Sequence, residues 1–288
     1  MRALEIIREM EEIIVGRFRE IQARVEELHL RGLMDVEALR EYSRLRKALE
    51  WVGDRYFELG GGRPILADRL RLDGGMRVLD VGSGDGWFSI QAGYLHRDVE
   101  FHGVELSEEY AEAREYAEIF GLENVHFYYL DAYETPFPDE AFDRVALFFS
   151  LSNIARGGVE ASRLFRECRR VLRRDGLLGV AEPLLEDFPE SLQPLLLRLY
   201  ETSGMGESLL GRGEVLRAME EAGLKPLSLE VVEPPEAGAP MDEAEAYLRS
   251  YYGCPPPMEE LGRLKLSRVW VRDDPPSYHI IIARPKRS

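Results

Sequence analysis

From about residue 76 onward, short β-rich runs alternate with helical stretches, and this alternation restricts the chain to few architectures. Such an alternation is typical of a parallel sheet with crossover helices. The predicted strands are Met76–Val81, Glu100–Val104, Val125–Leu130, Asp143–Phe149, Leu177–Ala181, Leu227–Val232 and Ser277–Ala283, and the predicted helices lie near residues 87–96, 108–120, 159–174, 189–202 and 212–222. The pattern therefore predicts an α/β fold.

The first 60 residues differ from the rest because their apolar side chains follow a helical period. One stripe consists of Ile7, Met10, Ile14, Phe18, Ile21, Val25 and Leu28, and a second consists of Leu39, Tyr42, Leu49, Val52, Tyr56 and Leu59, with Arg46 as its one break. Gly32 separates the two, and Asp35 is the expected N-cap of the second helix. We expect a helical hairpin or cap over residues 1–62, a boundary at Gly60–Pro64 and a second domain over 63–288. The hairpin could pack on that domain, form the interface of a homodimer, or cover a ligand.

Residues 233–276 form an irregular, proline-rich stretch between the last two predicted strands. One helical piece is expected around Glu243–Tyr252, and the stretch is interpreted as an insertion. It leaves the sixth strand at its carboxyl end, which is the ligand side of a parallel sheet. Tyr247, Tyr251 and Tyr252 are therefore candidates for the wall of a substrate pocket, or else they pack the insertion onto the sheet.

Composition excludes several classes of protein. The net charge of −16 disfavours a phosphate backbone as partner, no apolar run reaches the length of a membrane helix, and the N-terminal charges do not fit a signal peptide. Two cysteines, Cys168 and Cys254, are too few for a disulfide framework. We therefore expect a cytoplasmic location. With 33 Arg, 4 Lys, 3 Gln and 2 Asn, the composition also resembles that of heat-adapted proteins.

Residues 78–87, VLDVGSGDGW, combine a buried strand, a loop with glycines at alternate positions and the start of a helix. Glycine permits a positive φ and close approach of a ligand to the backbone, and the amides of a helix start attract an anion. The dinucleotide fingerprint G-x-G-x-x-G requires a small residue at position 87, where this chain has Trp87. The spacing G-x-G-x-G, with Asp80 two residues upstream, therefore indicates another ligand.

This motif resembles that of the class I S-adenosylmethionine-dependent methyltransferases, and four further features support the resemblance. Glu105 follows the second strand, Asp131 follows the third, residues 136–143 read PFPDEAFD, and residues 170–178 read RVLRRDGLL. The resemblance covers roughly residues 76–232 and is greatest to the small-molecule subgroup typified by ubiquinone and menaquinone biosynthesis enzymes. It implies a Rossmann-like, seven-stranded and mostly parallel sheet with an antiparallel last strand.

The resemblance also implies S-adenosylmethionine as the cofactor and a small molecule as the substrate. Glu105 would hold both ribose hydroxyls, Asp131 would lie near the adenine amino group, and Asp80 would contact the methionyl amino group. The implied cofactor-binding set is Asp80, Gly82, Ser83, Gly84, Gly86, Glu105, Leu106, Asp131, Ala132 and Phe149. Methyl transfer would be an in-line displacement that depends mainly on proximity and orientation.

The acceptor side is less defined. Many relatives have two histidines where this chain has Ser152 and Asn153, which could orient a substrate or cap the following turn. The N/D-P-P-Y/F motif of adenine-methylating enzymes is absent, and no histidine or cysteine spacing predicts a metal site. A protein or RNA methyltransferase, a non-catalytic protein that binds the cofactor, and an aminopropyl transferase remain as alternatives.

Overall fold

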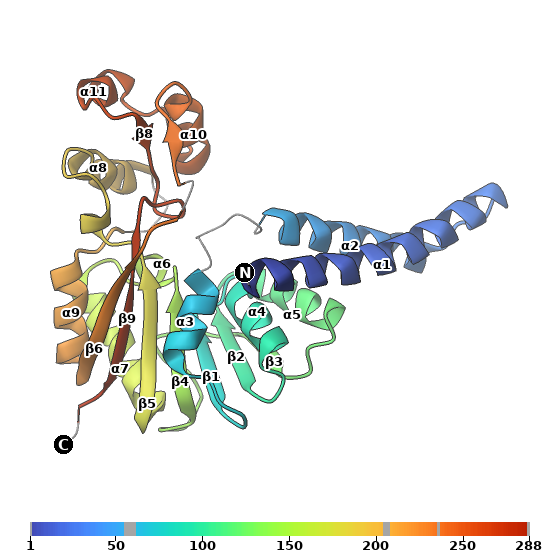
Figure 1. Ribbon diagram of the computed structural model, residues 1–288, viewed down its shortest axis with the longest axis horizontal. Coiled ribbons are helices and arrows are strands. Elements are labelled where there is room, and N and C mark those ends of the chain that lie inside the picture. The colour runs from blue at the N-terminus through green and yellow to red at the C-terminus, as the bar shows by residue number, and fades with distance from the viewer. Residues whose placement is uncertain (1, 55–61, 204–207, 235–236, 287–288) are drawn as a thin grey trace.

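Seven strands form one sheet in a computed structural model that describes residues 2–54, 62–203, 208–234 and 237–286 (Figure 1). In spatial order they are β3 (Val125–Tyr129), β2 (Glu100–Glu105), β1 (Arg77–Val81), β4 (Phe142–Phe148), β5 (Leu172–Glu182), β9 (Tyr278–Pro285) and β6 (Leu224–Val232). The pairs from β3 to β5 are parallel, whereas β9 is antiparallel to β5 and β6. The predicted mostly parallel sheet with an antiparallel last strand is confirmed.

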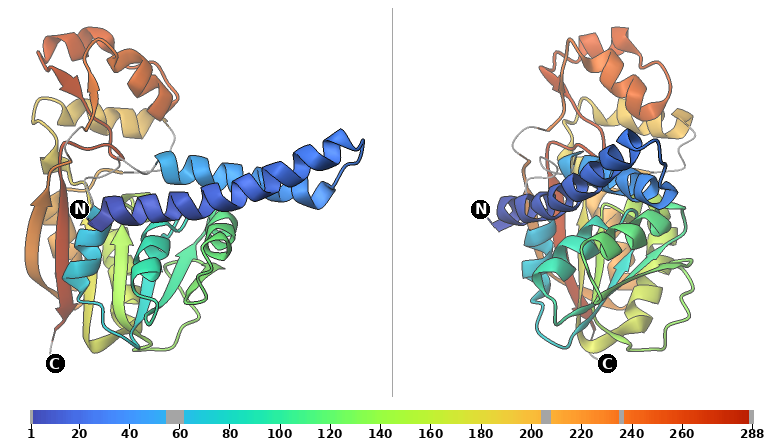
Figure 2. Two further views of the ribbon diagram at one scale, coloured as in Figure 1. Left: turned by 45° about the vertical axis from the view of Figure 1, so that its right-hand side comes forward. Right: turned by 90° about the vertical axis from the view of Figure 1, so that its right-hand side faces the viewer.

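Helices cover both faces of this sheet (Figure 2). One layer contains α3 (Gly62–Leu70), α4 (Trp87–Leu95) and α5 (Glu109–Ile119), and the other contains α7 (Gly158–Val171) and α9 (Arg212–Glu221), with the short α6 (Leu151–Ile154) at the carboxyl end of β4. Along β1 the side chains alternate: Val78 belongs to the first core cluster, and Leu79 and Val81 to the second. A strand buried on both faces explains the nearly continuous apolar sequence.

The connection between α7 and β5 differs from the prediction. The helix expected over residues 159–174 ends at Val171, and β5 begins at Leu172, earlier than the expected Leu177–Ala181. Leu172 pairs with Phe142, and a register shift follows before Leu177 pairs with Arg144. The polar residues between them interrupt the apolar pattern, so the sequence did not indicate that the strand extends through them.

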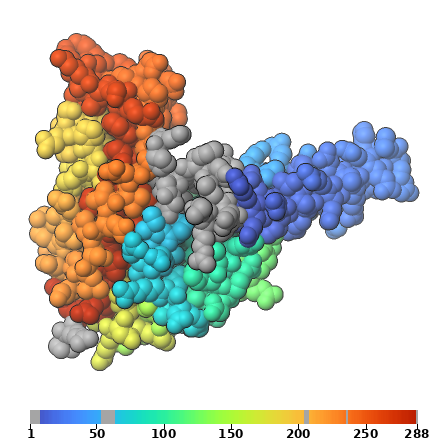
Figure 3. Space-filling view, in the orientation of Figure 1, coloured from blue at the N-terminus to red at the C-terminus, as the bar shows by residue number. Residues whose placement is uncertain are grey.

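The helices α1 (Arg2–Leu30) and α2 (Val36–Asp54) form the predicted hairpin. Gly32 has a φ of 68°, and Asp35 Oδ1 accepts the backbone N–H groups of Glu37 and Ala38, which confirms the predicted N-cap. The two helices lie across α4 and α5, and their far ends project beyond the sheet (Figures 1 and 3). The boundary at residues 60–64 lies partly outside the described residues, and the division at 62/63 stays a prediction.

The docked half of the hairpin contributes to the first core cluster through Met10, Ile14, Leu45, Ala48, Trp51 and Val52. Polar contacts add to this packing: Arg17 donates to the carbonyl of Ile119 at 3.0 Å, and Lys47 pairs with Glu112 of α5. These contacts join the hairpin to the α4–α5 layer.

No described helix has both the length and the apolar character needed to cross a membrane.

The region of the predicted insertion has a small core of its own. It contains α10 (Ala244–Tyr252), α11 (Met258–Arg263) and a two-stranded sheet of β7 (Ala239–Pro240) and β8 (Arg268–Val269). The third core cluster joins these elements to α8 (Gln193–Ser203), which precedes β6 in the chain, and the 3-10 turn η2 (Leu185–Asp187) leads from β5 toward it. This layer lies beyond the carboxyl ends of the parallel strands (Figure 1).

Candidate active site

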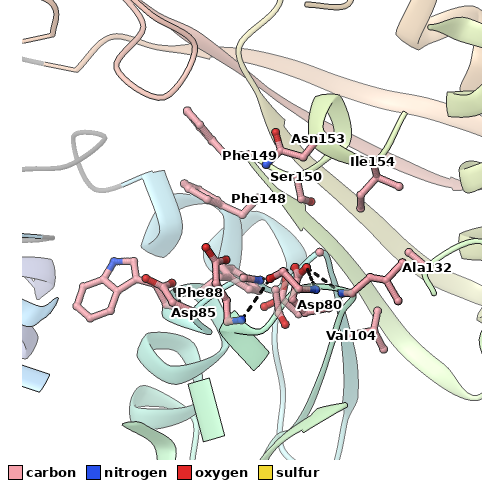
Figure 4. Close-up of a pocket in the computed structure, with 18 of the residues that line it drawn as sticks. Asp80, Asp85, Phe88, Val104, Ala132, Phe148, Phe149, Ser150, Asn153 and Ile154 are labelled. Atoms are coloured by element: carbon pink, nitrogen blue, oxygen red, sulfur yellow. Dashed lines mark hydrogen bonds between the residues drawn. The ribbon is translucent and has the colours of Figure 1, made fainter. Parts of the chain in front are cut away.

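A cavity of about 740 Å³ opens at the carboxyl ends of β1, β2 and β4. The chain continues from β1 to β2 and β3 on one side and returns to β4 on the other, so strand order reverses at this point. Ligands of open α/β sheets bind at such reversals. Figure 4 shows Asp80 and Val104 on one side of the cavity, with Phe149 and Asn153 on the other.

The loop that follows β1 forms the floor of the cavity. Gly82 has a φ of 68°, and a Cβ built there would lie 2.6 Å from Cβ of Ser150 and 2.9 Å from Cδ1 of Ile154. Gly84 has a φ of 51° and donates its N–H to Oε2 of Glu105 at 2.9 Å. Backbone conformation favours glycine at both positions, and at Gly82 there is also no space for a side chain.

Gly86 has a different role from the other two glycines of the motif. It precedes α4 with a φ of 82°, and a Cβ there would lie 2.5 Å from Cζ of Phe127 and 2.8 Å from Cβ of Ala113. Gly86 is not among the residues that line the cavity. Close packing of α4 therefore accounts for this glycine.

Glu105 connects the loop to the end of β2. Its Oε2 accepts the N–H of Gly84, and its Oε1 accepts those of Leu106 and Ser107 at 2.8 and 2.9 Å. A carboxylate has about four lone-pair sites, and these three N–H groups use one on Oε2 and two on Oε1, so Oε2 remains able to accept a ligand hydroxyl. The carboxylate is thus held in one orientation at the cavity wall.

Two further carboxylates lie at strand ends. Asp80 is 1% exposed and accepts a hydrogen bond from the Ser89 hydroxyl at 2.7 Å, and Oδ1 of Asp131 accepts the N–H of Tyr133 at 2.8 Å. Apart from Gly86, every predicted cofactor-binding residue lines the cavity: Asp80, Gly82, Ser83, Gly84, Glu105, Leu106, Asp131, Ala132 and Phe149. The structure therefore brings nine of the ten together in one place.

Comparisons with known proteins support the same interpretation of the site. A methyltransferase-domain family model matches residues 78–176, which contain the glycine loop, Glu105 and Asp131. The chain contains a class I S-adenosylmethionine-dependent methyltransferase domain. Its structure is similar to that of the [4+2]-cyclase SpnF, with a TM-score of 0.56 and 25% identity over 78% of this chain and 80% of that one.

Two curated relatives of this methyltransferase domain are named after small molecules. One is 27-O-demethylrifamycin SV methyltransferase from Amycolatopsis mediterranei, 33% identical over 58% of this chain and 60% of that protein. Another is demethylmenaquinone methyltransferase from Geobacillus kaustophilus, 29% identical over 56% of this chain and 76% of that protein. The chain spans between 53% and 60% of the length of the first four curated relatives that it matches.

The predicted acceptor-side residues of the methyltransferase domain lie in different surroundings. Asn153 lines the cavity, whereas Ser152 is fully buried and its backbone N–H donates to Glu182. Tyr247, Tyr251 and Tyr252 pack within the third core cluster and are not among the cavity-lining residues. The hydroxyl of Tyr251 nevertheless donates to Oδ2 of Asp273, which does line the cavity.

Sequence reasoning missed two groups of residues in this site. Asp85 lines the cavity, and its Oδ2 accepts the indole N–H of Trp51 in α2 at 2.7 Å. Arg272 and Asp273 reach the cavity from the predicted insertion. Asp85 lies inside the glycine motif, but no local sequence pattern indicates that Trp51, 34 positions upstream, contacts it. Likewise, no pattern indicates that Arg272 and Asp273 reach the same cavity.

Glu182, at the end of β5, is buried beside the methyltransferase cavity. Its carboxylate accepts the N–H groups of Leu151 and Ser152 at 3.1 and 3.2 Å. Burial raises the pKa of Glu182 from 4.5 to about 7, although the positive charge of Arg272 and the hydrogen bonds from Ser152 and Leu151 act in the opposite direction. This carboxyl therefore changes its charge near neutral pH.

We expect the free energy of unfolding to depend on Glu182 between pH 5 and pH 8. Because the pKa is higher in the folded state than in the unfolded one, the stabilising contribution is complete below about pH 4.5 and is lost as the pH rises through 7. A shift of that size corresponds to about 3 kcal/mol. Urea unfolding at both pH values should show that Glu182→Gln removes this loss.

The matched control is Glu259→Gln, which changes an exposed glutamate of α11 and should retain the pH dependence of the wild type. His279, which faces Glu182 in the β5–β9 register and hydrogen-bonds Asp187, is present in all three proteins. An equal loss of stability in wild type and Glu182→Gln would contradict the assignment.

Proposed function

We propose that this protein binds S-adenosylmethionine and transfers its methyl group to a small organic acceptor. The observation that carries the proposal is the arrangement at Glu105: a carboxylate fixed by three backbone N–H groups faces a cavity whose floor is the glycine loop. A carboxylate of this kind suits a ribose diol, because its open acceptor site on Oε2 can take a hydroxyl hydrogen. The family match over residues 78–176 supports the same ligand.

The charges of the cavity fit this cofactor. Its described lining contains six carboxylates, those of Asp80, Asp85, Glu105, Glu109, Asp131 and Asp273, and one basic side chain, that of Arg272. S-adenosylmethionine carries a sulfonium and an ammonium cation against one carboxylate, so an acidic wall attracts it. The volume of about 740 Å³ lies within the ~300–1,000 Å³ typical of small-molecule sites.

Different residues of the chain would hold different parts of the cofactor. Glu105 would hold the ribose, buried Asp80 the methionyl ammonium, and Asp131 the adenine side, while the N–H groups of the glycine loop approach the amino-acid end. The sulfonium, when bound, supplies an electrophilic methyl group with its own leaving group. Apolar side chains such as Phe88 and Phe149 would exclude water and hold the acceptor in line with that methyl group.

A small acceptor is supported by the names of the relatives and by the net charge of −16, which disfavours a polyanionic substrate. The likeness to a [4+2]-cyclase supports a second candidate, a protein that uses the same fold without transferring a methyl group. The two candidates differ in product: only the first converts S-adenosylmethionine to S-adenosylhomocysteine.

Calorimetry and a labelled-methyl assay together test the proposal. The wild-type protein should bind S-adenosylmethionine and S-adenosylhomocysteine, and it should label a component of a pooled metabolite extract but not RNA or peptides. Failure to bind either compound would refute the proposed cofactor. Binding without methyl transfer to any pool would favour the second candidate, and labelling confined to RNA or peptides would refute the small acceptor.

A further inference from the structure

Arg272 and Asp273 are set apart from the other cavity-lining residues by their origin. All other described lining residues lie between positions 80 and 154, within the part of the chain that carries the cofactor motifs. Arg272 and Asp273 occupy the centre of a tight turn after β8, which is closed by a bridge between Val271 and Asp274. Residues on such loops commonly determine substrate choice on a shared scaffold.

This turn is held in place by several polar contacts. Asp273 Oδ1 accepts hydrogen bonds from Nε and Nη2 of Arg272 at 2.9 and 2.5 Å, and its Oδ2 accepts one from the Tyr251 hydroxyl at 3.1 Å. The backbone N–H of Arg272 donates to the Tyr200 hydroxyl at 3.2 Å. The pair therefore has a fixed orientation before any ligand arrives.

The Arg272 side chain is only 2% exposed, although it carries a charge. Its positive charge stabilises the charged form of the buried Glu182 carboxyl, and its guanidinium pairs with Asp273. A buried ion pair adds little net stability, because desolvation offsets the attraction between the charges. Stability alone therefore gives little reason for an arginine at the wall of this cavity.

The lining offers few routes for a proton that leaves an acceptor. Within the part of the chain that the structure describes, no histidine, lysine or cysteine lines the cavity. The other lining carboxylates, Asp80, Asp85, Glu105, Glu109 and Asp131, belong to the part of the chain that carries the cofactor motifs. Asp273 combines a carboxylate with an adjacent guanidinium, which is the combination that removes a proton and stabilises the resulting oxyanion.

Resting on the proposed methyl transfer, we infer that Arg272 and Asp273 bind the acceptor and that the acceptor is a phenol or enol on an apolar, planar body. The hydroxyl proton moves to a carboxylate oxygen of Asp273, and the oxyanion is held by the Arg272 guanidinium. The acceptor oxygen then forms its bond to the methyl carbon as the carbon–sulfur bond breaks, and that electron pair stays on sulfur. Phe149 and Ile154, next to Asn153 in Figure 4, provide the apolar wall for the ring.

The test measures binding of 4-nitrophenol to protein loaded with S-adenosylhomocysteine, with the absorbance of the phenolate as readout. The wild type should lower the pKa of the bound phenol and should bind it more tightly than its methyl ether, 4-nitroanisole. Arg272→Gln should weaken phenolate binding about 10- to 100-fold, the range for one charge-assisted contact, and Arg272→Lys should lie between the two. Asp273→Asn should keep phenolate binding but lose methyl transfer to phenolic acceptors.

Arg249→Gln is the matched control, because it changes an exposed arginine of α10 in the same region and should leave every readout unchanged. All variants should bind S-adenosylhomocysteine as the wild type does, so a failure of the cofactor proposal would appear separately, in the wild-type titration. Absence of phenolate binding in the wild type, or equal binding in Arg272→Gln, would overturn the inference. Transfer to amines but not to phenols or enols would overturn it as well.

Discussion

Replacement of Glu105 by alanine is expected to weaken the binding of S-adenosylmethionine at least about 100-fold. The substitution removes the carboxylate that would accept from the ribose, and one charge-assisted hydrogen bond contributes about 1.5–3 kcal/mol. It also leaves the N–H groups of Gly84, Leu106 and Ser107 without the carboxylate that they contact, so the glycine loop loses one of its connections to β2. Calorimetric titration with the cofactor measures the effect directly.

Two further variants test whether the loss of affinity comes from the contact to the ribose, from the support of the glycine loop, or from the loss of a negative charge in the cavity. Glu105→Gln keeps one carbonyl oxygen for the backbone N–H groups and should lose about 10-fold in affinity, less than the alanine variant. Glu109→Ala removes another carboxylate from the cavity wall, at the start of α5, and should cost much less because no predicted contact to the ribose depends on it. A dissociation constant for Glu105→Ala within about threefold of the wild-type value would refute the assigned role.

The sequence was sufficient to predict the sheet because inner strands such as β1, β2 and β9 are buried on both faces and must be apolar. It was less informative where short elements depend on tertiary contacts. The elements α6, α11, β7 and β8 are two to six residues long, too short for a periodic pattern to emerge. The α3 helix was missed because it begins at the last of three consecutive glycines and contains Pro64, and such residues usually indicate a turn.

The candidate site likewise has one part that the sequence predicts and one part that it does not. Its cofactor side lies on consecutive strand ends, so the order of the motifs places Asp80, Glu105 and Asp131 on one edge of the sheet. Gly86 was assigned to the ligand because a glycine that faces a ligand and one that allows close packing are identical in sequence. Arg272 and Asp273 lie in a region without motif or period, and only the folded chain brings them to the cavity.

Replacement of Trp51 by alanine is expected to cause a large loss of stability. Trp51 is 7% exposed and lies at the contact between α2 and the body of the protein. Its ring stacks on Tyr116 with centroids 4.3 Å apart and meets Trp87 edge-on at 4.4 Å. Loss of a buried tryptophan costs about 3–5 kcal/mol, and urea unfolding should show a decrease of that size.

Lys47→Ala supplies the comparison for Trp51→Ala. Lys47 also joins α2 to α5, through an ion pair with Glu112, but both side chains are largely exposed. Such pairs contribute about 0–1 kcal/mol, so this variant should remain close to the wild type. If Trp51→Ala lost no more stability than Lys47→Ala, the aromatic contact would not be what holds the hairpin to the sheet.

Trp51→Phe tests whether the hairpin also supports the cofactor site. Phenylalanine keeps an aromatic ring in the cluster but cannot donate to Oδ2 of Asp85, which the indole N–H contacts at 2.7 Å. Since Asp85 lies between Gly84 and Gly86, loss of this contact frees the loop that forms the cavity floor. We expect about a 10-fold loss of cofactor affinity, the equivalent of one hydrogen bond to a charged group. Because Trp51→Phe retains most of the buried ring, a loss of affinity that exceeds its loss of stability would identify the hairpin as part of the binding site, whereas unchanged affinity would restrict its role to packing.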